Sequence, residues 1–259
     1  IPNVAVFYTE FGTTLPPEAY MYALPYPCYT ELRIRRYGFH GTSHKYIARQ
    51  TAKFVGKDPS QLRSITMHLG NGSSMTCVKN GKCFDTSMGL TPLEGLIMGT
   101  RCGSIDPAIV PYLEERKGYT PQEVDALMNK QSGLLGICGY TDMRDIHAEA
   151  AKGDEKCKLA VEMLIRSIRK QLGAYVFLLD GNVDAIVFTA GIGENDPHVR
   201  AQVCARLESI GIRLDEKENE LRKSEPREIS TPDSRIKVLI IPTNEELEIA
   251  EATLKVLGK

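Results

Sequence analysis

The sequence predicts an α/β fold with a mixed sheet and flanking helices. Apolar runs typical of strands occur at residues 64–69, 183–189 and 236–241, and long stretches with helical patterning separate them. The dipeptide Asn80-Gly81 adds a strong hairpin signal just after the first run. Strands, a hairpin and large helices that interleave along one chain favour the α/β class.

The N-terminal part is predicted to alternate short strands with one helix. Residues 4–8 read as a strand, so we expect the chain to begin inside a fold, and prolines 16, 17, 25 and 27 break up the segment that follows. A helix is predicted to begin after Thr42 or Ser43 as N-cap and to end near Gly56. The strand at 64–69 then leads through a glycine-rich turn into the strands of the hairpin, at 75–78 and 82–86.

Long helices dominate the second half of the prediction. They are expected at 106–116, 121–130 and 148–179. The strand at 183–189 runs into a glycine-containing loop, and a helix follows with Asp196 as N-cap and Pro197 at its first position. After the last strand, Pro242-Thr243-Asn244 leads into a C-terminal helix.

Composition excludes several classes of protein. The chain has 259 residues, 42% hydrophobic and 25% charged residues and a net charge of −1, which argues against a nucleic-acid binder held by a basic field. No apolar run reaches membrane-spanning length, so a membrane partner is not expected. Seven scattered cysteines without a Cys-x-x-Cys motif argue against a disulfide framework or zinc site and favour the cytoplasm.

Glycine-rich turns after strands supply candidate phosphate sites. The run from His68 to Ser74 points several backbone N–H groups into one space, although a plain tight hairpin is an equally good interpretation. No P-loop or protein-kinase motif set occurs in the chain. Gly191-Ile192-Gly193 begins like a dinucleotide fingerprint but has Asp196 at the third glycine position, so that match fails.

Cations and histidines beside small residues suit a phosphoryl group. In residues 35–43, His40 lies between two glycines and behind two arginines, and Arg101 also lies among glycines, where it is either a bidentate phosphate donor or a surface residue. Asp142-Met143-Arg144 has the same ambiguity. His40 and His44 are four apart, but His40 precedes the helix, so a metal pair is not favoured, and His147 and His198 are expected on the surface.

The order and wording of five segments resemble the acetate kinase family. These segments are 36–44 (Arg-Tyr-Gly-Phe-His-Gly-Thr-Ser-His), 68–73 (His-Leu-Gly-Asn-Gly-Ser), 91–96 (Thr-Pro-Leu-Glu-Gly-Leu), 191–195 (Gly-Ile-Gly-Glu-Asn) and 242–246 (Pro-Thr-Asn-Glu-Glu). The resemblance implies a ribonuclease-H-like lobe of the actin-like ATPase superfamily and reversible phosphoryl transfer between ATP and acetate, giving acetyl phosphate and ADP. It also implies Mg²⁺ as cofactor, a homodimer and a cytoplasmic location.

The resemblance assigns a role to each matching position. It implies that His40 and Arg101 stabilise the transition state, that Glu245 helps bind Mg²⁺, and that Phe39, Pro92 and Leu93 wall the acyl pocket. The implied nucleotide-binding residues are His68, Leu69, Gly70, Asn71, Gly72, Asp142, Met143, Arg144, Gly191, Ile192, Gly193, Glu194 and Asn195.

The sequence departs from the family pattern at three positions. Tyr8 stands at the end of the first strand, where the family has a catalytic aspartate, and a neutral phenol cannot replace that negative charge. Gly12 stands where histidine is usual, and Ser104 stands where aspartate is usual, which removes a carboxylate near Arg101.

The resemblance also implies a domain division. Residues 1–9 and 244–259 correspond to remnants of the family's first lobe, and residues 10–243 correspond to its second, nucleotide-binding lobe. The rest of the first lobe would lie N-terminal to residue 1, and an apolar face of the C-terminal helix (Leu247, Ala250, Leu254, Leu257) would pack on it. A non-catalytic nucleotide-binding or dimerisation module and a propionate kinase therefore remain as alternatives.

Overall fold

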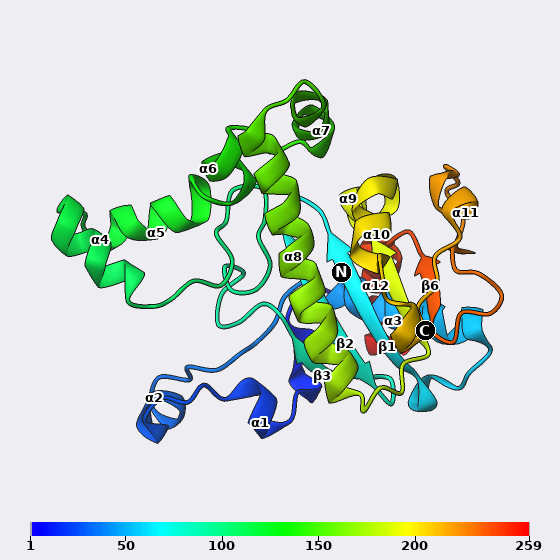
Figure 1. The fold of residues 1–259 in the computed structure, drawn as a ribbon. Coiled ribbons are helices and arrows are strands. Elements are labelled where there is room, and N and C mark those ends of the chain that lie inside the picture. Colours follow the sequence, from blue (N-terminus) through cyan, green and yellow to red (C-terminus); the bar gives the residue numbers. More distant parts are fainter. Residues whose placement is uncertain (1, 259) are drawn as a thin grey trace.

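The computed structural model describes residues 2–258, which form a six-stranded mixed sheet with helices on both faces (Figure 1). The strand order is β3-β2-β1-β4-β6-β5. Strands β1, β4 and β6 are mutually parallel, whereas β2, β3 and β5 run antiparallel to their neighbours. The strands are β1 (Arg63–Leu69), β2 (Ser73–Lys79), β3 (Lys82–Thr86), β4 (Ala185–Thr189), β5 (Arg227–Glu228) and β6 (Lys237–Ile240).

Helices supply most of the remaining structure within residues 2–258. The α-helices are α1 (Pro17–Tyr20), α2 (Tyr26–Thr30), α3 (Gly41–Val55), α4 (Ile109–Lys117), α5 (Pro121–Lys130), α6 (Gly133–Cys138), α7 (Met143–Ala151), α8 (Glu155–Leu178), α9 (Ala190–Asn195), α10 (Pro197–Cys204), α11 (Glu216–Glu220) and α12 (Glu245–Val256). Short 3₁₀ turns cover Glu10–Thr14, Pro59–Gln61 and Glu208–Ile210.

Two hydrophobic layers cover the sheet, one on each face. Alternate residues of a strand point to opposite faces, so Ile186 and Phe188 of β4 pack in the layer under α8, while Ala185 and Val187 pack under α3 with Ile47. Figure 1 shows α8 crossing one face of the sheet. Because both faces are covered, the parallel strands read as continuous apolar runs in the sequence.

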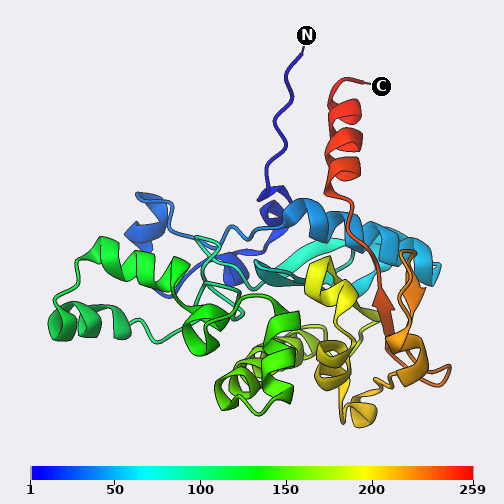
Figure 2. The same ribbon diagram turned by 90° about the horizontal axis from the view of Figure 1, so that it is seen from above.

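The predicted strand at residues 4–8 is wrong. These residues have no regular structure up to a turn at Tyr8, and the side chain of Phe7 is 68% exposed. A strand needs a neighbouring strand for its backbone hydrogen bonds, and this segment instead extends away from the sheet. Figure 2 shows it projecting from the body beside α12.

Three helix predictions also need correction. Helix α3 begins at Gly41 rather than after Thr42 or Ser43. The helix predicted at 148–179 is two helices, because Gly153 adopts a left-handed φ of 103° and Asp154 caps α8 by accepting a hydrogen bond from the Cys157 N–H. Residues 190–195, predicted as a loop, form the short helix α9.

Other local predictions are confirmed. Asn80 and Gly81 have φ values of 56° and 71°, as a type I′ hairpin requires. Asp196 caps α10 through the Val199 N–H, with Pro197 at the first helical position. No helix of residues 2–258 has the length and apolar character needed to cross a membrane.

Candidate functional site

The candidate site lies at the carboxyl ends of two adjacent parallel strands. His68 in β1 is paired in register with Thr189 in β4. Strand β1 continues into the turn at 70–72 and returns as β2, whereas β4 continues into α9. In open α/β sheets, ligands bind in the crevice outside the carboxyl ends of the strands, where neighbouring connections diverge.

Backbone geometry aims His40 into this crevice. His40 is the N-cap of α3 and has a left-handed φ of 54°, which is uncommon for a residue other than glycine. The next residue, Gly41, donates its N–H to the Tyr8 carbonyl at 2.8 Å, and a Cβ at Gly41 would lie only 2.4 Å from that oxygen. Close packing therefore requires a glycine at position 41, directly after His40.

Arg101 meets His40 over the turn. A Cβ built on Gly72 would lie 3.3 Å from Arg101 Nη1 and 3.4 Å from His40 Nε2, so both side chains converge on the space above this glycine. The same Nη1 donates to the Pro92 carbonyl at 3.3 Å, which ties the guanidinium to the 91–96 segment. Ser104, where a carboxylate is usual, accepts a hydrogen bond from the Gly95 N–H and belongs to this loop framework.

Three histidines cluster behind the crevice. The rings of His40 and His68 stack with centroids 4.1 Å apart. Burial, together with neighbouring imidazole charge, lowers the pKa of His40 to about 3, and burial lowers that of His68 to about 4. Burial also holds the pKa of His44 well below its usual value. All three imidazoles are therefore neutral at pH 7.

These lowered pKa values predict a loss of stability in acid. Below about pH 6.5 the unfolded chain binds protons at these histidines and the folded chain does not, so the free energy of unfolding should fall as pH falls. Each histidine contributes up to about 1.4 kcal/mol per pH unit, and carboxylates contribute little above about pH 5. Urea unfolding between about pH 6.5 and pH 5 measures this slope.

The matched control is His147→Gln. Its hydrogen bond to Asp196 raises the pKa of His147, so its contribution to stability is complete below about pH 6.5 and is lost only as pH rises. His147→Gln should therefore leave the acid slope unchanged, whereas His40→Asn should reduce it. Equal slopes in the parent chain and His40→Asn would contradict the prediction.

Tyr8 and Glu245 meet at the edge of the crevice where the two chain ends emerge. The Tyr8 hydroxyl donates to Glu245 Oε2 at 3.3 Å, and the Thr42 hydroxyl donates to Oε1 at 2.8 Å. Partial burial and the Glu245 carboxylate raise the pKa of Tyr8, so its phenol is neutral at pH 7. Residues 2–258 hold no group of three or more possible metal-ligating His, Cys, Asp or Glu side chains.

A large cavity adjoins the other side of the turn. Its volume is about 710 Å³, and predicted residues from three segments line it: Gly70, Asn71, Asp142, Met143, Arg144, Gly191, Ile192 and Asn195. Asp142 caps α7, and its hydrogen bonds to Arg144 lower its pKa to about 2. The turn at 70–72 therefore joins this cavity to the His40–Arg101 space.

Not every predicted residue faces the cavity. Leu69 is buried in the core under α8. Glu194 turns inward, where Oε1 accepts from the N–H groups of Ala190 at 2.8 Å and Thr243 at 3.3 Å and so links β4, α9 and the 242–244 segment. The close approach of Gly193 to Phe188 likewise belongs to the packing of α9.

Two of the three predicted acyl-pocket residues line different hollows. The Pro92 carbonyl accepts a hydrogen bond from Arg101, whereas Phe39 lines a small hollow with Tyr8 and Gly41. Leu93 lines a separate hollow of about 490 Å³ with Ser104.

The sequence interpretation missed six residues that line the large cavity: Thr141, His147, Asp196, Pro197, His198 and Arg222. His147, expected on the surface, is half-buried and bonds Asp196 at 2.8 Å, and both line the cavity together with Arg222. The sequence offered one signal for this contact, namely Asp196. Only one of its carboxylate oxygens is needed to cap α10, so the other can accept a further hydrogen bond.

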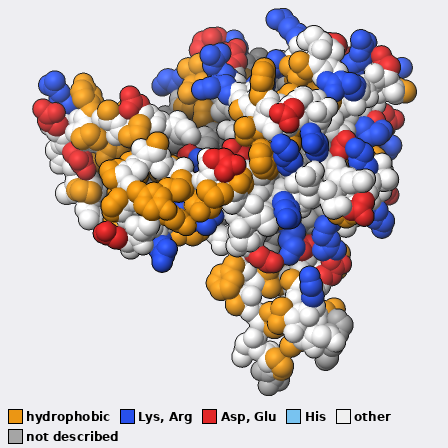
Figure 3. Space-filling model, turned by 90° about the horizontal axis from the view of Figure 1, so that it is seen from below, with side chains coloured by type: hydrophobic (Ala, Val, Ile, Leu, Met, Phe, Trp, Pro, Cys, Tyr) orange, Lys and Arg blue, Asp and Glu red, His pale blue; other side chains and the backbone are white. Residues whose placement is uncertain are grey.

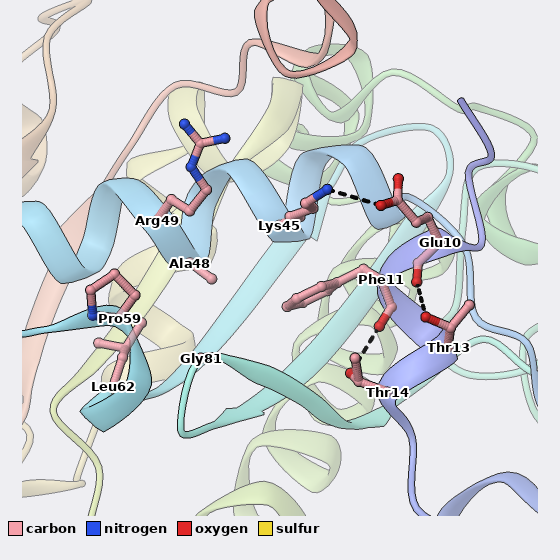
Figure 4. Close-up of a pocket in the computed structure, with 10 residues that line it drawn as sticks. All are labelled: Glu10, Phe11, Thr13, Thr14, Lys45, Ala48, Arg49, Pro59, Leu62 and Gly81. Atoms are coloured by element: carbon pink, nitrogen blue, oxygen red, sulfur yellow. Dashed lines mark hydrogen bonds and ion pairs between the residues drawn. The ribbon is translucent and has the colours of Figure 1, made fainter. Parts of the chain in front are cut away.

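A further cavity of about 280 Å³ lies on the other side of α3, between that helix and the 10–14 turn (Figure 4). Its charged groups are already paired. Lys45 bonds Glu10 and Glu248, and Arg49 bonds Glu248 and Glu251. Glu248 is only 2% exposed, so these pairs fasten α12 to α3.

Comparison with known proteins shows the family of the chain. Residues 1–251 match the model of the acetokinase family. The acetate kinase of Desulfovibrio desulfuricans is 74% identical over the whole chain, which spans 64% of that relative's length. That of Campylobacter fetus is 54% identical, and the chain spans 65% of it.

Solved structures give the same result. The acetate kinase of Porphyromonas gingivalis superposes with a TM-score of 0.94 at 43% identity, covering 97% of this chain and 63% of that one. A propionate kinase from Francisella tularensis superposes with a TM-score of 0.89 at 45% identity, covering 95% and 62%. The predicted α/β, actin-like ATPase fold is confirmed. The chain belongs to the acetokinase family.

Proposed function

We propose that the chain is part of an acetate kinase-type phosphotransferase, which transfers a phosphoryl group reversibly between ATP and acetate to give acetyl phosphate and ADP. The observation that carries the proposal is the turn at 70–72. On one side His40 and Arg101 converge over Gly72, and on the other side Gly70 and Asn71 line the 710 Å³ cavity. A nucleotide in that cavity would direct its phosphates over the turn towards His40 and Arg101.

The chemistry requires charge neutralisation rather than a protein nucleophile. A transferring phosphoryl group carries charge on three equatorial oxygens, so catalysis depends on positioning and electrostatic stabilisation. Arg101 offers a planar fork of donors, and neutral His40 offers one N–H. Acetate is ionised at pH 7, so it needs no general base before it attacks.

The site offers Mg²⁺ one carboxylate ligand. Magnesium at nucleotide sites is usually bound through one or two carboxylates together with substrate phosphates and waters. Glu245 supplies one carboxylate beside Thr42 and Tyr8, so we assign it as the protein ligand. When bound, the ion would neutralise charge on the phosphates.

We also propose that the two ends of the chain, residues 1–9 and 244–259, belong to the family's first lobe. Residues 2–9 and α12 leave the body side by side (Figure 2), and the apolar side chains Leu247, Leu254 and Leu257 at the C-terminal end are exposed. In this division residues 10–243 form the nucleotide-binding lobe, and the other lobe can lie opposite His40.

The test uses the chain alone and a chimaera in which it replaces the matching 64% of the Desulfovibrio desulfuricans acetate kinase. Hydroxamate formation from acetate and ATP measures turnover, and calorimetry measures ADP binding. We expect both proteins to bind ADP and the chimaera to turn over. Absence of ADP binding in both would refute the proposal.

Two alternatives predict different results. A non-catalytic nucleotide-binding or dimerisation module, favoured by Tyr8, predicts ADP binding without turnover in the chimaera. A propionate kinase predicts a higher kcat/KM with propionate, but a pocket rejects one extra methylene by only about 1–3 kcal/mol. Both acids should therefore be assayed together.

Replacing Tyr8 by aspartate should raise the turnover of the chimaera. Tyr8 is neutral and donates to Glu245, whereas an aspartate in its place would add a negative charge that can order metal-bound water. Tyr8→Asn is the control, since it is smaller than tyrosine but uncharged. Equal kcat values for the parent chimaera and its Tyr8→Asp variant would show that a negative charge at position 8 does not raise turnover.

Replacing Gly72 by valine should lower ligand affinity more than stability. Its Cβ would enter the space between His40 and Arg101, where the neighbouring atoms lie 3.3–3.5 Å away. We expect ADP to bind at least about tenfold more weakly by calorimetry, a loss of about 1.4 kcal/mol, with the urea midpoint almost unchanged. Gly173→Ala, with open space around its Cβ, is the control. Full affinity in Gly72→Val would show that phosphates do not pass over this turn.

We further propose a cytoplasmic homodimer. Exposed hydrophobic side chains gather on the arm that carries α1, α2, α4 and α5 (Figure 3), among them Leu24, Tyr26, Ile105, Ile109 and Tyr112. Exposed apolar patches of this kind mark association sites. All seven cysteines are unpaired, which suits a reducing compartment. Light scattering of the chain and of Tyr112→Glu would test the dimer, which the variant should weaken.

A further inference from the structure

A line of hydrogen bonds runs from His40 into the interior. His40 Nδ1 is 2.8 Å from Ser74 Oγ, and the same oxygen is 2.7 Å from His44 Nε2. His44 Nδ1 is in turn 2.7 Å from Thr66 Oγ1. The line therefore crosses from the start of α3, through β2 and α3, to the middle of β1.

The inner members of this line are buried and uncharged. Ser74 and Thr66 are fully buried and His44 is 1% exposed. Burial keeps both imidazoles neutral, because it lowers the pKa of His40 and of His44. A neutral imidazole carries one N–H and one lone pair, and a hydroxyl has one proton. Ser74 could accept from both imidazoles, but its own proton would then have no acceptor among the described residues, since its hydroxyl has no other hydrogen-bond partner there. With that arrangement excluded, each hydrogen bond fixes the direction of the next, and the line has two possible directions.

The far end of the line selects one direction. If His40 Nδ1 were the first donor, the Thr66 hydroxyl would have to donate elsewhere, and its remaining acceptor is the Thr76 carbonyl at 3.5 Å. That distance is too long for a good hydrogen bond. In the opposite direction Thr66 donates to His44 at 2.7 Å, His44 Nε2–H donates to Ser74, and Ser74 donates to His40 Nδ1.

We propose that Thr66, His44 and Ser74 are positioning residues that hold His40 as its Nε2–H tautomer, so that an uncharged His40 presents a hydrogen-bond donor above Gly72. Within residues 2–258, His40 Nε2 has no hydrogen-bond partner, and it is the ring nitrogen nearest the Gly72 space. The role given to this donor rests on the proposed phosphoryl transfer. The other tautomer would direct a lone pair at the oxygens of a phosphoryl group.

The experiment reads the tautomer directly. The chain, labelled with ¹⁵N-histidine, has five histidines, and two-dimensional ¹H–¹⁵N spectra of the rings distinguish protonated from unprotonated nitrogens. His40→Asn assigns the His40 signals. We expect His40 Nε2 to be protonated and Nδ1 to be unprotonated at pH 7, without nucleotide.

Variants of Thr66 test the cause. Thr66→Val keeps the shape of the side chain and removes the first donor, so the Nδ1–H tautomer of His40 should become populated. Thr66→Ser restores the hydroxyl and should restore the parent spectrum. Thr76→Val is the matched control: it removes an equally buried hydroxyl from the paired position on β2, which bonds Thr86 and lies outside the line.

Two results would overturn the proposal: a His40 with Nδ1–H in the parent chain, or a Thr66→Val spectrum identical to the parent's. If Thr66→Val does not fold, Ser74→Ala asks the same question one bond closer to His40. The readout needs no turnover. An inactive chimaera with the expected tautomer would refute the proposed function alone, and an active chimaera with the other tautomer would refute this inference alone.

Discussion

Replacing Arg200 by leucine is expected to lower the free energy of unfolding by about 3–5 kcal/mol, at the upper end of single substitutions. Arg200 is 2% exposed, and its guanidinium donates to the carbonyls of Gly193, Glu194 and Asn219 and to the Asn219 side chain. Leucine would leave these acceptors without donors. Each unsatisfied buried group costs about 1–3 kcal/mol, and some of them would regain water.

The urea midpoint and slope of the 259-residue chain measure this loss. Arg166→Leu, an exposed arginine on α8, is the control and should change stability little. Because two of the acceptors belong to α9, Arg200→Leu should also weaken ADP binding under conditions where the protein is still folded. A loss of less than about 1 kcal/mol would show that solvent or neighbouring groups replace the guanidinium.

Arg200 also shows what sequence reasoning lacked. It is four residues after the Asp196 cap, so its helix was predicted, but nothing in the pattern distinguishes it from a surface arginine. Its partner Asn219 lies nineteen residues further on, in α11. Burial lowers the pKa of Arg200 to about 10, a cost that only the completed network of carbonyl acceptors can offset.

Local signals predicted the elements that local chemistry determines. The Asn80-Gly81 hairpin, the Asp196-Pro197 helix start and the Gly56 helix end depend on a few neighbouring residues, and each is confirmed. The strand at 4–8 failed because a strand depends on a partner elsewhere in space. The start of α3 failed because the left-handed conformation of His40 depends on the contact between Gly41 and the Tyr8 carbonyl.

The site was predicted only in pieces. Each segment taken alone was as consistent with a plain turn as with a phosphate site, and only their order indicated the family. The convergence of His40, Gly72 and Arg101 could not be derived from spacing, because the three residues are far apart in the sequence and meet through the β1–β2 turn. The hydrogen-bonded line behind His40 had no sequence signal, since it joins four residues from three elements.

Replacing Arg101 by leucine in the chimaera is expected to lower kcat by about 10²–10³-fold, the usual loss when one donor to transition-state charge is removed. Arg101 Nη1 lies on the Gly72 space with His40, but Arg101 does not line the 710 Å³ cavity. ADP affinity should therefore change far less than kcat. Hydroxamate assays and calorimetry on the same protein separate the two effects.

Two variants sharpen this prediction. Arg101→Lys keeps the charge but loses the planar fork, so it should recover only part of the lost rate. Arg166→Leu, which removes an exposed arginine on α8, should leave kcat unchanged. If Arg101→Leu weakens ADP binding as much as it lowers kcat, Arg101 acts on the bound nucleotide rather than on the transferring group. If kcat alone falls, His40→Gln combined with Arg101→Leu should lose less than the product of the two single effects, because groups that act on one transition state are not additive.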